Sequence, residues 1–174
     1  MAASYSNRGT GATARRAALP LRADALQQRL EEEIGRAERY GTGLACLLVV
    51  IENLDELASK YGAELIEQAP EHLAAAIDPG LRLFDTVGRP AARELLIALP
   101  GTDGPRAEVV ARRALERLRA IKVEAQGTRI PLRIAVGLAV WQEGMSAQAL
   151  LEGARRAAPG GGAEGLEEEG APLL

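Results

Sequence analysis

The chain has 174 residues, of which 47% are hydrophobic and 26% are charged, and its formal net charge is −3. This composition excludes a wholly disordered chain, and an acidic balance with only 3% aromatic residues argues against a nucleic-acid-binding protein. The longest apolar run, at residues 44–51, is far shorter than the roughly 20 residues of a membrane-spanning helix, and the first 25 residues contain no apolar signal segment. We therefore expect a soluble, cytoplasmic protein without membrane insertion.

Periodicity and capping residues predict alternating helices and strands. In chain order, these are a helix at 25–40, a strand at 44–51, helices at 54–60 and 63–77, strands at 81–87 and 94–99, a helix at 105–121, a strand at 130–140 and a helix at 147–158. Asp24, Asn53 and Ser146 are the expected N-caps, and Pro105 opens the long helix. Pro70 should bend or shorten its helix because proline has no N–H to donate. The order indicates an α/β (α+β) fold with a mixed sheet covered by helices.

The two ends of the chain differ from its centre in charge. Residues 1–23 contain four arginines and no acidic residue, whereas residues 159–174 contain four glutamates and no basic residue. Both ends are rich in small residues and bury too little apolar surface to offset the entropy lost on ordering. We predict a flexible basic tail at residues 1–14, a folded domain at residues 15–158 and a flexible acidic tail at residues 159–174.

A single cysteine and a single histidine limit the available chemistry. Cys46 cannot form an internal disulfide and lies in the most apolar strand, so we interpret it as buried and inert. His72 has no partner for acid–base catalysis nearby in the sequence, and we expect its side chain to be exposed. The two residues provide no cluster for zinc, and we expect neither a metal nor a cofactor.

Four segments carry residues at a characteristic spacing. They read ALPLR at 18–22, LLVVIENLDELASKYG at 47–62, DTVGRPAAREL at 85–95 and IAVG at 134–137. In order and spacing they resemble GLPNR, LLIDIDxFKxINDxYG, DxxxRxGGDEF and SIG of the GGDEF domains, which condense two GTP molecules into cyclic di-GMP. The resemblance covers residues 18–158, and it implies a nucleotidyl-cyclase-like palm with a central mixed sheet of five strands.

The chain departs from this family at the positions that carry catalysis. Two family glycines let the backbone approach the nucleotide phosphates, and Ala91 and Ala92 stand in their place. The two carboxylates that hold the catalytic divalent cations in the family are replaced by Val50 and Arg93, which offer no anionic ligand. Only Glu94 remains of the catalytic group, and we prefer to interpret Arg93 and Glu94 as solvated hairpin side chains. The sequence therefore predicts no cyclase activity and no bound metal.

Further family positions that hold the nucleotide also differ. The guanine-reading Asn and Asp of the family become Ala58 and Glu67, and the phosphate-binding Lys and Arg become Gly162 and Leu166. These exchanges argue against a site that still binds GTP.

A second constellation of the family is retained. The family binds its own product through an RxxD motif placed five residues before the glycine pair, and Arg82 and Asp85 stand at that offset. Two further family arginines match Arg113 and Arg36, the latter of which would reach a ligand held by a neighbouring domain. A guanidinium donates to the O6/N7 edge of guanine, and a carboxylate accepts from its N1–H and N2–H2. We therefore assign Arg82 and Asp85 to guanine, Arg113 to base or phosphate and Arg36 to a cross-domain contact. The alternative for Arg82 and Asp85 is a surface ion pair, which contributes at most about 1 kcal/mol.

Two classes of function follow from these observations. The first is a catalytically inactive cyclic di-GMP receptor, whose partners are an unidentified downstream protein and, through Arg36, a second copy in a ligand-linked homodimer. The second is a protein-interaction module that kept the fold after losing nucleotide binding. A regulatory domain that still binds GTP is a third candidate, against which Val50, Ala58, Ala91 and Ala92 count.

Overall fold

The computed structural model describes residues 19–159. The predicted tails fall outside this range, apart from Pro159, and so do Gly162 and Leu166. Helices and strands follow in the order α1 (Ala23–Tyr40), β1 (Leu44–Ile51), α2 (Leu54–Tyr61), α3 (Leu65–Ile77), a 3-10 turn (Asp78–Gly80), β2 (Thr86–Gly88), β3 (Glu94–Pro100), α4 (Gly104–Arg119), β4 (Lys122–Ala125), β5 (Thr128–Pro131), β6 (Ile134–Val140) and α5 (Ala147–Ala157).

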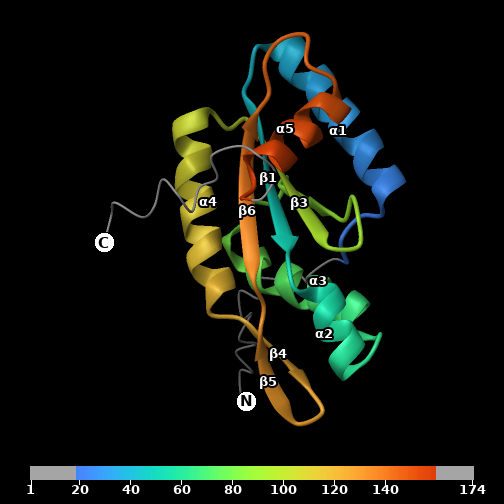
Figure 1. Cartoon of the computed structure of the whole chain (residues 1–174). Coiled ribbons are helices and arrows are strands. Elements are labelled where there is room, and N and C mark those ends of the chain that lie inside the picture. Colours follow the sequence, from blue (N-terminus) through green and yellow to red (C-terminus); the bar gives the residue numbers. More distant parts are fainter. Residues whose placement is uncertain (1–18, 160–174) are drawn as a thin grey trace, which may run out of the picture.

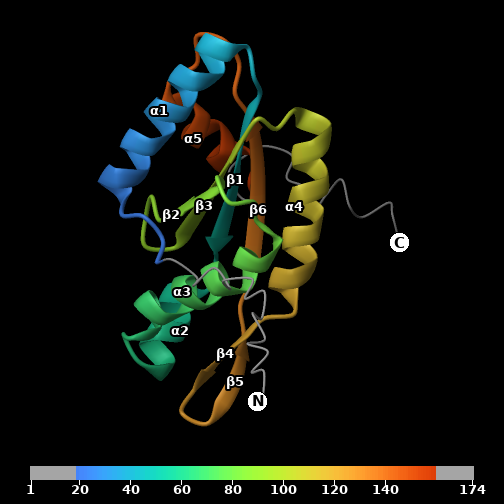
Figure 2. The same ribbon diagram turned by 180° about the vertical axis from the view of Figure 1, so that it is seen from behind.

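A four-stranded antiparallel sheet forms the centre of the molecule, with its strands in the order β2-β3-β1-β6. Helices α1 and α5 cover one face, and α3 and α4 pack against the other (Figures 1 and 2). The predicted α+β class is confirmed. The expected mixed sheet of five strands is wrong, because the parallel pairing within residues 19–159 is limited to an isolated bridge between Leu21 and Gly88.

Strand β1 is central because both of its faces are apolar. Successive side chains of a strand point to opposite faces, so Leu47 packs in the core beneath α4 and Leu48 in the core beneath α1 and α5. The bounds of β1 agree with the strand predicted at residues 44–51. Burial raises the pKa of the Cys46 thiol to about 12, so this thiol is protonated near neutral pH, in agreement with its interpretation as inert.

The first residues of the helices show which of the predicted N-caps form. Ser146 caps α5 and Asp103 caps α4, each accepting a hydrogen bond from a backbone N–H in the first turn, and Pro105 lies in that turn of α4 as predicted. The prediction of Asp24 as a cap is wrong, because Arg22 occupies the N-cap of α1 and its carbonyl accepts the first helical hydrogen bond at 2.8 Å. Asp24 is the second residue of α1, and in this first turn its carboxylate interacts favourably with the positive end of the helix dipole.

A separate hairpin, β4–β5, projects from the end of the sheet (Figure 1). The single strand predicted at 130–140 is wrong, because this stretch divides between β5 and β6. Gln126 and Gly127 connect β4 to β5, and both have positive φ, as the two-residue turn that matches strand twist requires. Asn53, at the N-cap position of α2, accepts a hydrogen bond from the Arg133 N–H at 2.9 Å and so holds the base of the hairpin instead of capping its helix.

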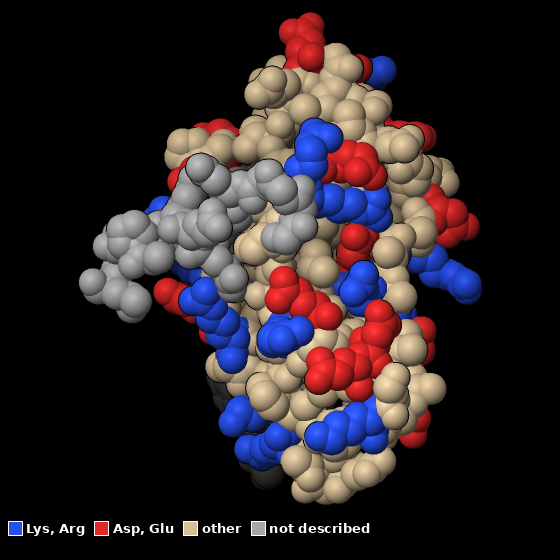
Figure 3. All heavy atoms as spheres, viewed as in Figure 1, with Lys and Arg blue, Asp and Glu red and all other residues tan. Residues whose placement is uncertain are grey.

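Two helix boundaries differ from the predicted ones. α3 begins at Leu65 instead of residue 63, and α4 ends at Arg119 instead of residue 121. His72 is exposed, as predicted. Within the described part of the chain, none of the helices is long and apolar enough to cross a membrane. On the face seen in Figure 3, basic and acidic side chains are interspersed.

Candidate functional site

The β2–β3 hairpin carries most of the residues predicted to be functional, at its two ends. Gly88 of β2 faces Leu96 of β3. The connection between these strands, residues 89–93, lies at one end, and we call it the hairpin turn. Residues 82–85 precede β2 and contact Pro100 at the far end of β3, and we call them the RxxD turn.

Next to the hairpin turn, Glu94 is bound by an arginine of α5. Val50 and Glu94 lie opposite each other on β1 and β3, on the face that α5 covers. Arg155 donates to both oxygens of the Glu94 carboxylate, from Nε at 2.9 Å and from Nη2 at 2.8 Å, and it also donates to Glu152 at 2.8 Å. The hydrogen bond to Glu94 raises the pKa of Arg155, whose positive charge is thereby secured. The interpretation of Glu94 as a solvated side chain is wrong, because α5 covers it and supplies a fixed cation.

The other residues of the hairpin turn offer no metal ligand. Ala91, Ala92 and Arg93 are exposed, and Arg93 lies 3.8 Å from Asp55 of α2 in an exposed ion pair. Among residues 19–159, no group of three or more His, Cys, Asp or Glu side chains is placed to hold a metal ion. Divalent cations such as Mg²⁺ require several oxygen ligands. The residues present here therefore do not fit the cations that the resemblance implies.

Arg89 holds the hairpin turn against α3. It donates to Glu67 Oε2 at 2.7 Å, to the Ile66 carbonyl at 2.7 Å and to the Ala92 carbonyl at 2.9 Å. In a regular helix the Ile66 carbonyl would accept from residue 70, but Pro70 has no N–H, so the Arg89 guanidinium supplies the missing donor. The predicted effect of Pro70 is thus compensated, and α3 continues through it.

A broad cavity of about 890 Å³ lies between the hairpin turn, the start of α1 and α3. Its charged lining residues are Arg22 and Arg89 against Asp24, Glu67 and Glu71. Arg89 is already paired with Glu67, and the acidic residues outnumber the basic ones. Since a nucleoside triphosphate is strongly negative, this charge distribution disfavours it. Ala58, on α2, adds no polar side-chain group.

The RxxD turn is closed by its own aspartate. The Arg82 N–H donates to Asp85 Oδ2 at 2.8 Å, and the Asp85 N–H donates to the Arg82 carbonyl at 3.1 Å. A short acidic side chain that accepts from a nearby backbone N–H favours a turn over an extended strand. The strand predicted at 81–87 is therefore wrong over most of its length and begins only at Thr86.

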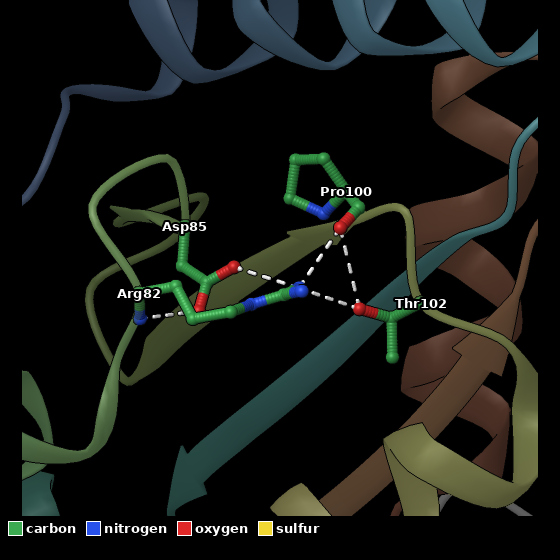
Figure 4. A network of polar contacts seen from close by, with 4 residues as sticks. All are labelled: Arg82, Asp85, Pro100 and Thr102. Atoms are coloured by element: carbon green, nitrogen blue, oxygen red, sulfur yellow. Dashed lines mark hydrogen bonds and ion pairs between the residues drawn. The ribbon is translucent and has the colours of Figure 1, made fainter. Parts of the chain in front are cut away.

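The Arg82 side chain connects this turn to the end of β3 (Figure 4). Its Nη2 donates to Asp85 Oδ1 at 3.3 Å, to the Pro100 carbonyl at 2.8 Å and to Thr102 Oγ1 at 2.7 Å. Only 3% of the Asp85 side chain is exposed, whereas 48% of the Arg82 side chain is exposed. A buried carboxylate thus fixes a cation that reaches the surface, an arrangement more ordered than the surface ion pair considered as the alternative.

Arg113 lies on one side of the RxxD turn. It lines a small cavity of about 130 Å³ together with Gly80 and Leu81, the two residues that directly precede Arg82. The structure therefore brings this arginine of α4 beside the segment with which the sequence grouped it.

Arg36 lies on the other side of the turn. It lines a cavity of about 380 Å³ together with Phe84 of the RxxD turn, and its Nη1 is held by Glu33 at 2.9 Å. Arg36 and Arg113 thus lie in different cavities, one lined also by Phe84 of the RxxD turn and the other by the two residues that precede this turn.

A family model described as "Diguanylate cyclase, GGDEF domain" matches residues 19–164. The chain belongs to the GGDEF family. Diguanylate cyclase DgcP of Pseudomonas aeruginosa is 27% identical over 143 residues, which are 80% of this chain and 21% of DgcP. The present GGDEF domain therefore spans about a fifth of the length of this curated relative.

Solved structures share the fold of this GGDEF domain. The GGDEF domain of DgcB from Caulobacter crescentus, solved in complex with c-di-GMP, superimposes with a TM-score of 0.72 at 16% identity, covering 84% of this chain and 87% of that one. Diguanylate cyclase SiaD of Pseudomonas aeruginosa, solved with its activator SiaC, gives a TM-score of 0.71 at 22% identity, covering 76% of this chain and 51% of SiaD. At such identities the similarity establishes the fold.

Three residues that organise this GGDEF domain were missed by the sequence analysis. Arg155 is 61 residues from Glu94, so helical spacing on α5 reveals only its bond to Glu152. Arg89 stood within a motif, but nothing in the sequence connected it to the carbonyl left free by Pro70. Thr102 is a buried polar residue just before a helix cap, and no local pattern predicts that it accepts from Arg82.

Proposed function

We propose that this GGDEF domain is a cyclic di-GMP receptor that does not synthesise the dinucleotide. The observation that carries the proposal is the RxxD turn, in which buried Asp85, Thr102 and the Pro100 carbonyl hold a half-exposed Arg82. Ordering a long cationic side chain before the ligand arrives removes part of the entropy cost of binding. An incidental surface arginine has no need of three fixed partners.

The chemistry of the ligand suits the arginines around this turn. Cyclic di-GMP has two guanines, whose O6/N7 edges accept two parallel hydrogen bonds from a guanidinium, and two phosphates that need positive charge. We assign Arg82 to a guanine edge and Arg113 to base or phosphate. Asp85 holds Arg82 in the unbound domain, and its own contact with a base requires the turn to open, because the carboxylate is buried.

The residues at and beside the hairpin turn support the proposal that the domain does not synthesise cyclic di-GMP. Phosphoryl transfer depends on divalent cations that neutralise developing charge. Where the family places its metal ligands, this chain has Val50 and an exposed Arg93, and the Glu94 carboxylate is occupied by Arg155. Two further sets of exchanges support the loss of synthesis. Ala91 and Ala92 replace the glycines of the family, and Ala58 and Glu67 replace its guanine-reading residues.

Relatives give the proposal its biological setting. DgcB, with the same fold, was solved with c-di-GMP, and SiaD was solved with a protein activator. We propose that ligand binding here is passed to a partner protein, and that Arg36 contributes to the ligand site of a second copy.

Calorimetric titration with cyclic di-GMP tests the receptor function. The unaltered chain should bind, Arg82→Ala should weaken binding at least tenfold, and Arg113→Ala should weaken it less. Arg93→Ala and Arg112→Ala are matched controls, because both remove an exposed arginine, one at the hairpin turn and one beside Arg113 on α4. Both controls should bind as the unaltered chain does.

The same titrations separate the alternatives. Absence of binding by the unaltered chain would favour a protein-interaction module, and binding of GTP in place of the dinucleotide would favour a GTP-dependent regulator.

Sedimentation tests the role of Arg36. Ligand should raise the dimer fraction, and Arg36→Ala should reduce that rise while binding persists.

A further inference from the structure

Two exposed aromatic rings lie beside the RxxD turn in a chain that has few aromatic residues. Tyr40 is 68% exposed and Phe84 is 52% exposed, although rings of this size are usually covered. Both line the cavity of about 380 Å³ that Arg36 also lines, a volume within the range of about 300–1,000 Å³ typical of ligand pockets. An exposed ring costs solvation free energy, so this grouping calls for an explanation.

The backbone fixes where each ring lies. Tyr40 is the last residue of α1, and the helix ends there because Gly41 adopts φ 63°, a left-handed conformation that favours glycine. The Phe84 ring lies against the Arg82 guanidinium, whose central carbon is 5.0 Å from the ring centroid. Such a cation–π contact restricts the ring without covering it.

Two glycines, Gly43 and Gly101, also line the cavity. The Gly101 N–H donates to the Gly43 carbonyl at 2.7 Å, which brings the connections before β1 and after β3 together. Pro100, whose carbonyl accepts from Arg82, also lines the cavity. Glycine and proline in this part of the lining leave room beside the two exposed rings.

We infer that Tyr40 and Phe84 form a stacking site for one guanine base of the cyclic di-GMP that a second copy of the chain holds, with Arg36 directed at the edge of that base. This inference rests on the proposed function and adds to it two residues that no motif of the sequence assigned. Aromatic rings bind any base by its π-face, so they supply affinity. Arg36, 58% exposed and held by Glu33, supplies the preference for guanine, whose O6 and N7 both accept where adenine presents a donor at N6.

A flat protein-docking patch explains the same residues less well. Leu83 is more exposed than either ring, at 82%, and would be the anchor of such a patch, but it lines a different cavity, with Arg29 and Asp85. The rings line a hollow that an arginine also lines, and this arrangement suits a planar, hydrogen-bonding ligand.

Titration of ring variants with cyclic di-GMP tests the inference. Tyr40→Ala and Phe84→Ala should each raise Kd about tenfold, since stacking of one base on an aromatic ring is worth this much on truncation. Tyr40→Phe and Phe84→Tyr keep a ring and should bind within about twofold of the unaltered chain. Leu83→Ala is the matched control, because it removes a still more exposed apolar side chain that lines a different cavity, and its Kd should not change. The rings are exposed, so thermal unfolding should show that all variants fold.

Fluorescence provides a second measurement at the site. In Phe84→Trp, cyclic di-GMP should quench the added tryptophan emission, and cyclic di-AMP should do so only at much higher concentration. Leu83→Trp should show little quenching. The unaltered chain, which carries only Trp141, gives the baseline.

The outcomes distinguish this inference from the function on which it rests. If the dinucleotide binds in an Arg82-dependent manner while both alanine variants keep the unaltered Kd, the stacking site is wrong and the receptor stands. If the unaltered chain does not bind cyclic di-GMP, both are wrong. Equal quenching in Phe84→Trp and Leu83→Trp would also overturn the stacking site.

Discussion

Each end of the β2–β3 hairpin has a carboxylate paired with an arginine, but the two arginines differ in their other hydrogen-bond partners and in their exposure. At the hairpin turn, Glu94 and Arg155 close on each other with two short hydrogen bonds, and Arg89 is bound by α3. At the RxxD turn, the carboxylate of Asp85 is buried but about half of the Arg82 side chain remains exposed. One end uses its charges to join structural elements, and the other holds a charge at the surface.

The difference shows that one hairpin can hold its two ends through separate sets of partners. The hairpin turn and the adjoining Glu94 take their partners from α3 and α5, whereas the RxxD turn takes them from the end of β3 and the connection to α4. Because the ends share strands but draw on different elements, we expect exchanges at one end to leave the packing of the other unchanged. The predictions below test whether the two ends are as independent as this geometry indicates.

The largest effect on stability should come from Asp85→Ala. This change leaves the Arg82 N–H without its acceptor and removes a charge-assisted bond from a buried position, so the free energy of unfolding should fall by about 2 kcal/mol. Urea denaturation measures it. Asp55→Ala is the control, because the exposed pair of Asp55 with Arg93 should contribute almost nothing. A cost for Asp85→Ala as small as the control's would reduce the RxxD turn to a surface feature.

Glu94→Gln should cost less, about 1 kcal/mol, because the pair with Arg155 is partly exposed to solvent. The amide keeps the shape and one acceptor but removes the charge. The difference from the unaltered chain should shrink in high salt, since screening weakens a partly exposed pair. Binding of cyclic di-GMP should not change, and a large change in its Kd would show that the two ends are coupled.

Local signals in the sequence predicted the fold wherever one face or one cap decided the structure. The apolar run from Leu44 to Ile51 predicted β1 because nothing but a central strand accommodates two apolar faces, and Ser146 predicted the start of α5. The β4–β5 hairpin was missed, although Gln126 and Gly127 between short alternating runs are the signal that could have revealed it.

The candidate site was predictable only where a motif is contiguous. Arg82 and Asp85 are three residues apart in one motif, which grouped them as candidates. Their contact depends on the turn, because in the predicted strand the two side chains would point to opposite faces. Glu94 pairs with Arg155 because of the way α5 crosses the sheet, and no periodic pattern in the sequence predicts that crossing. The strand predicted through Arg82 failed for a related reason, because the aspartate's bond to the backbone competes with strand pairing and prevails.

The smallest expected effect is that of restoring the family's glycines. Ala91→Gly together with Ala92→Gly removes two methyl groups from an exposed turn, so the backbone there can approach a phosphate again. Val50 still offers no ligand, Arg93 still adds positive charge, and Arg155 still occupies Glu94. Incubation of the double variant with GTP and Mg²⁺ should therefore yield no cyclic di-GMP by chromatography, while an active diguanylate cyclase run in parallel does yield it. Product from the double variant would mean that metal can still bind next to the hairpin turn. The two ends of the hairpin would then differ less than their contacts indicate.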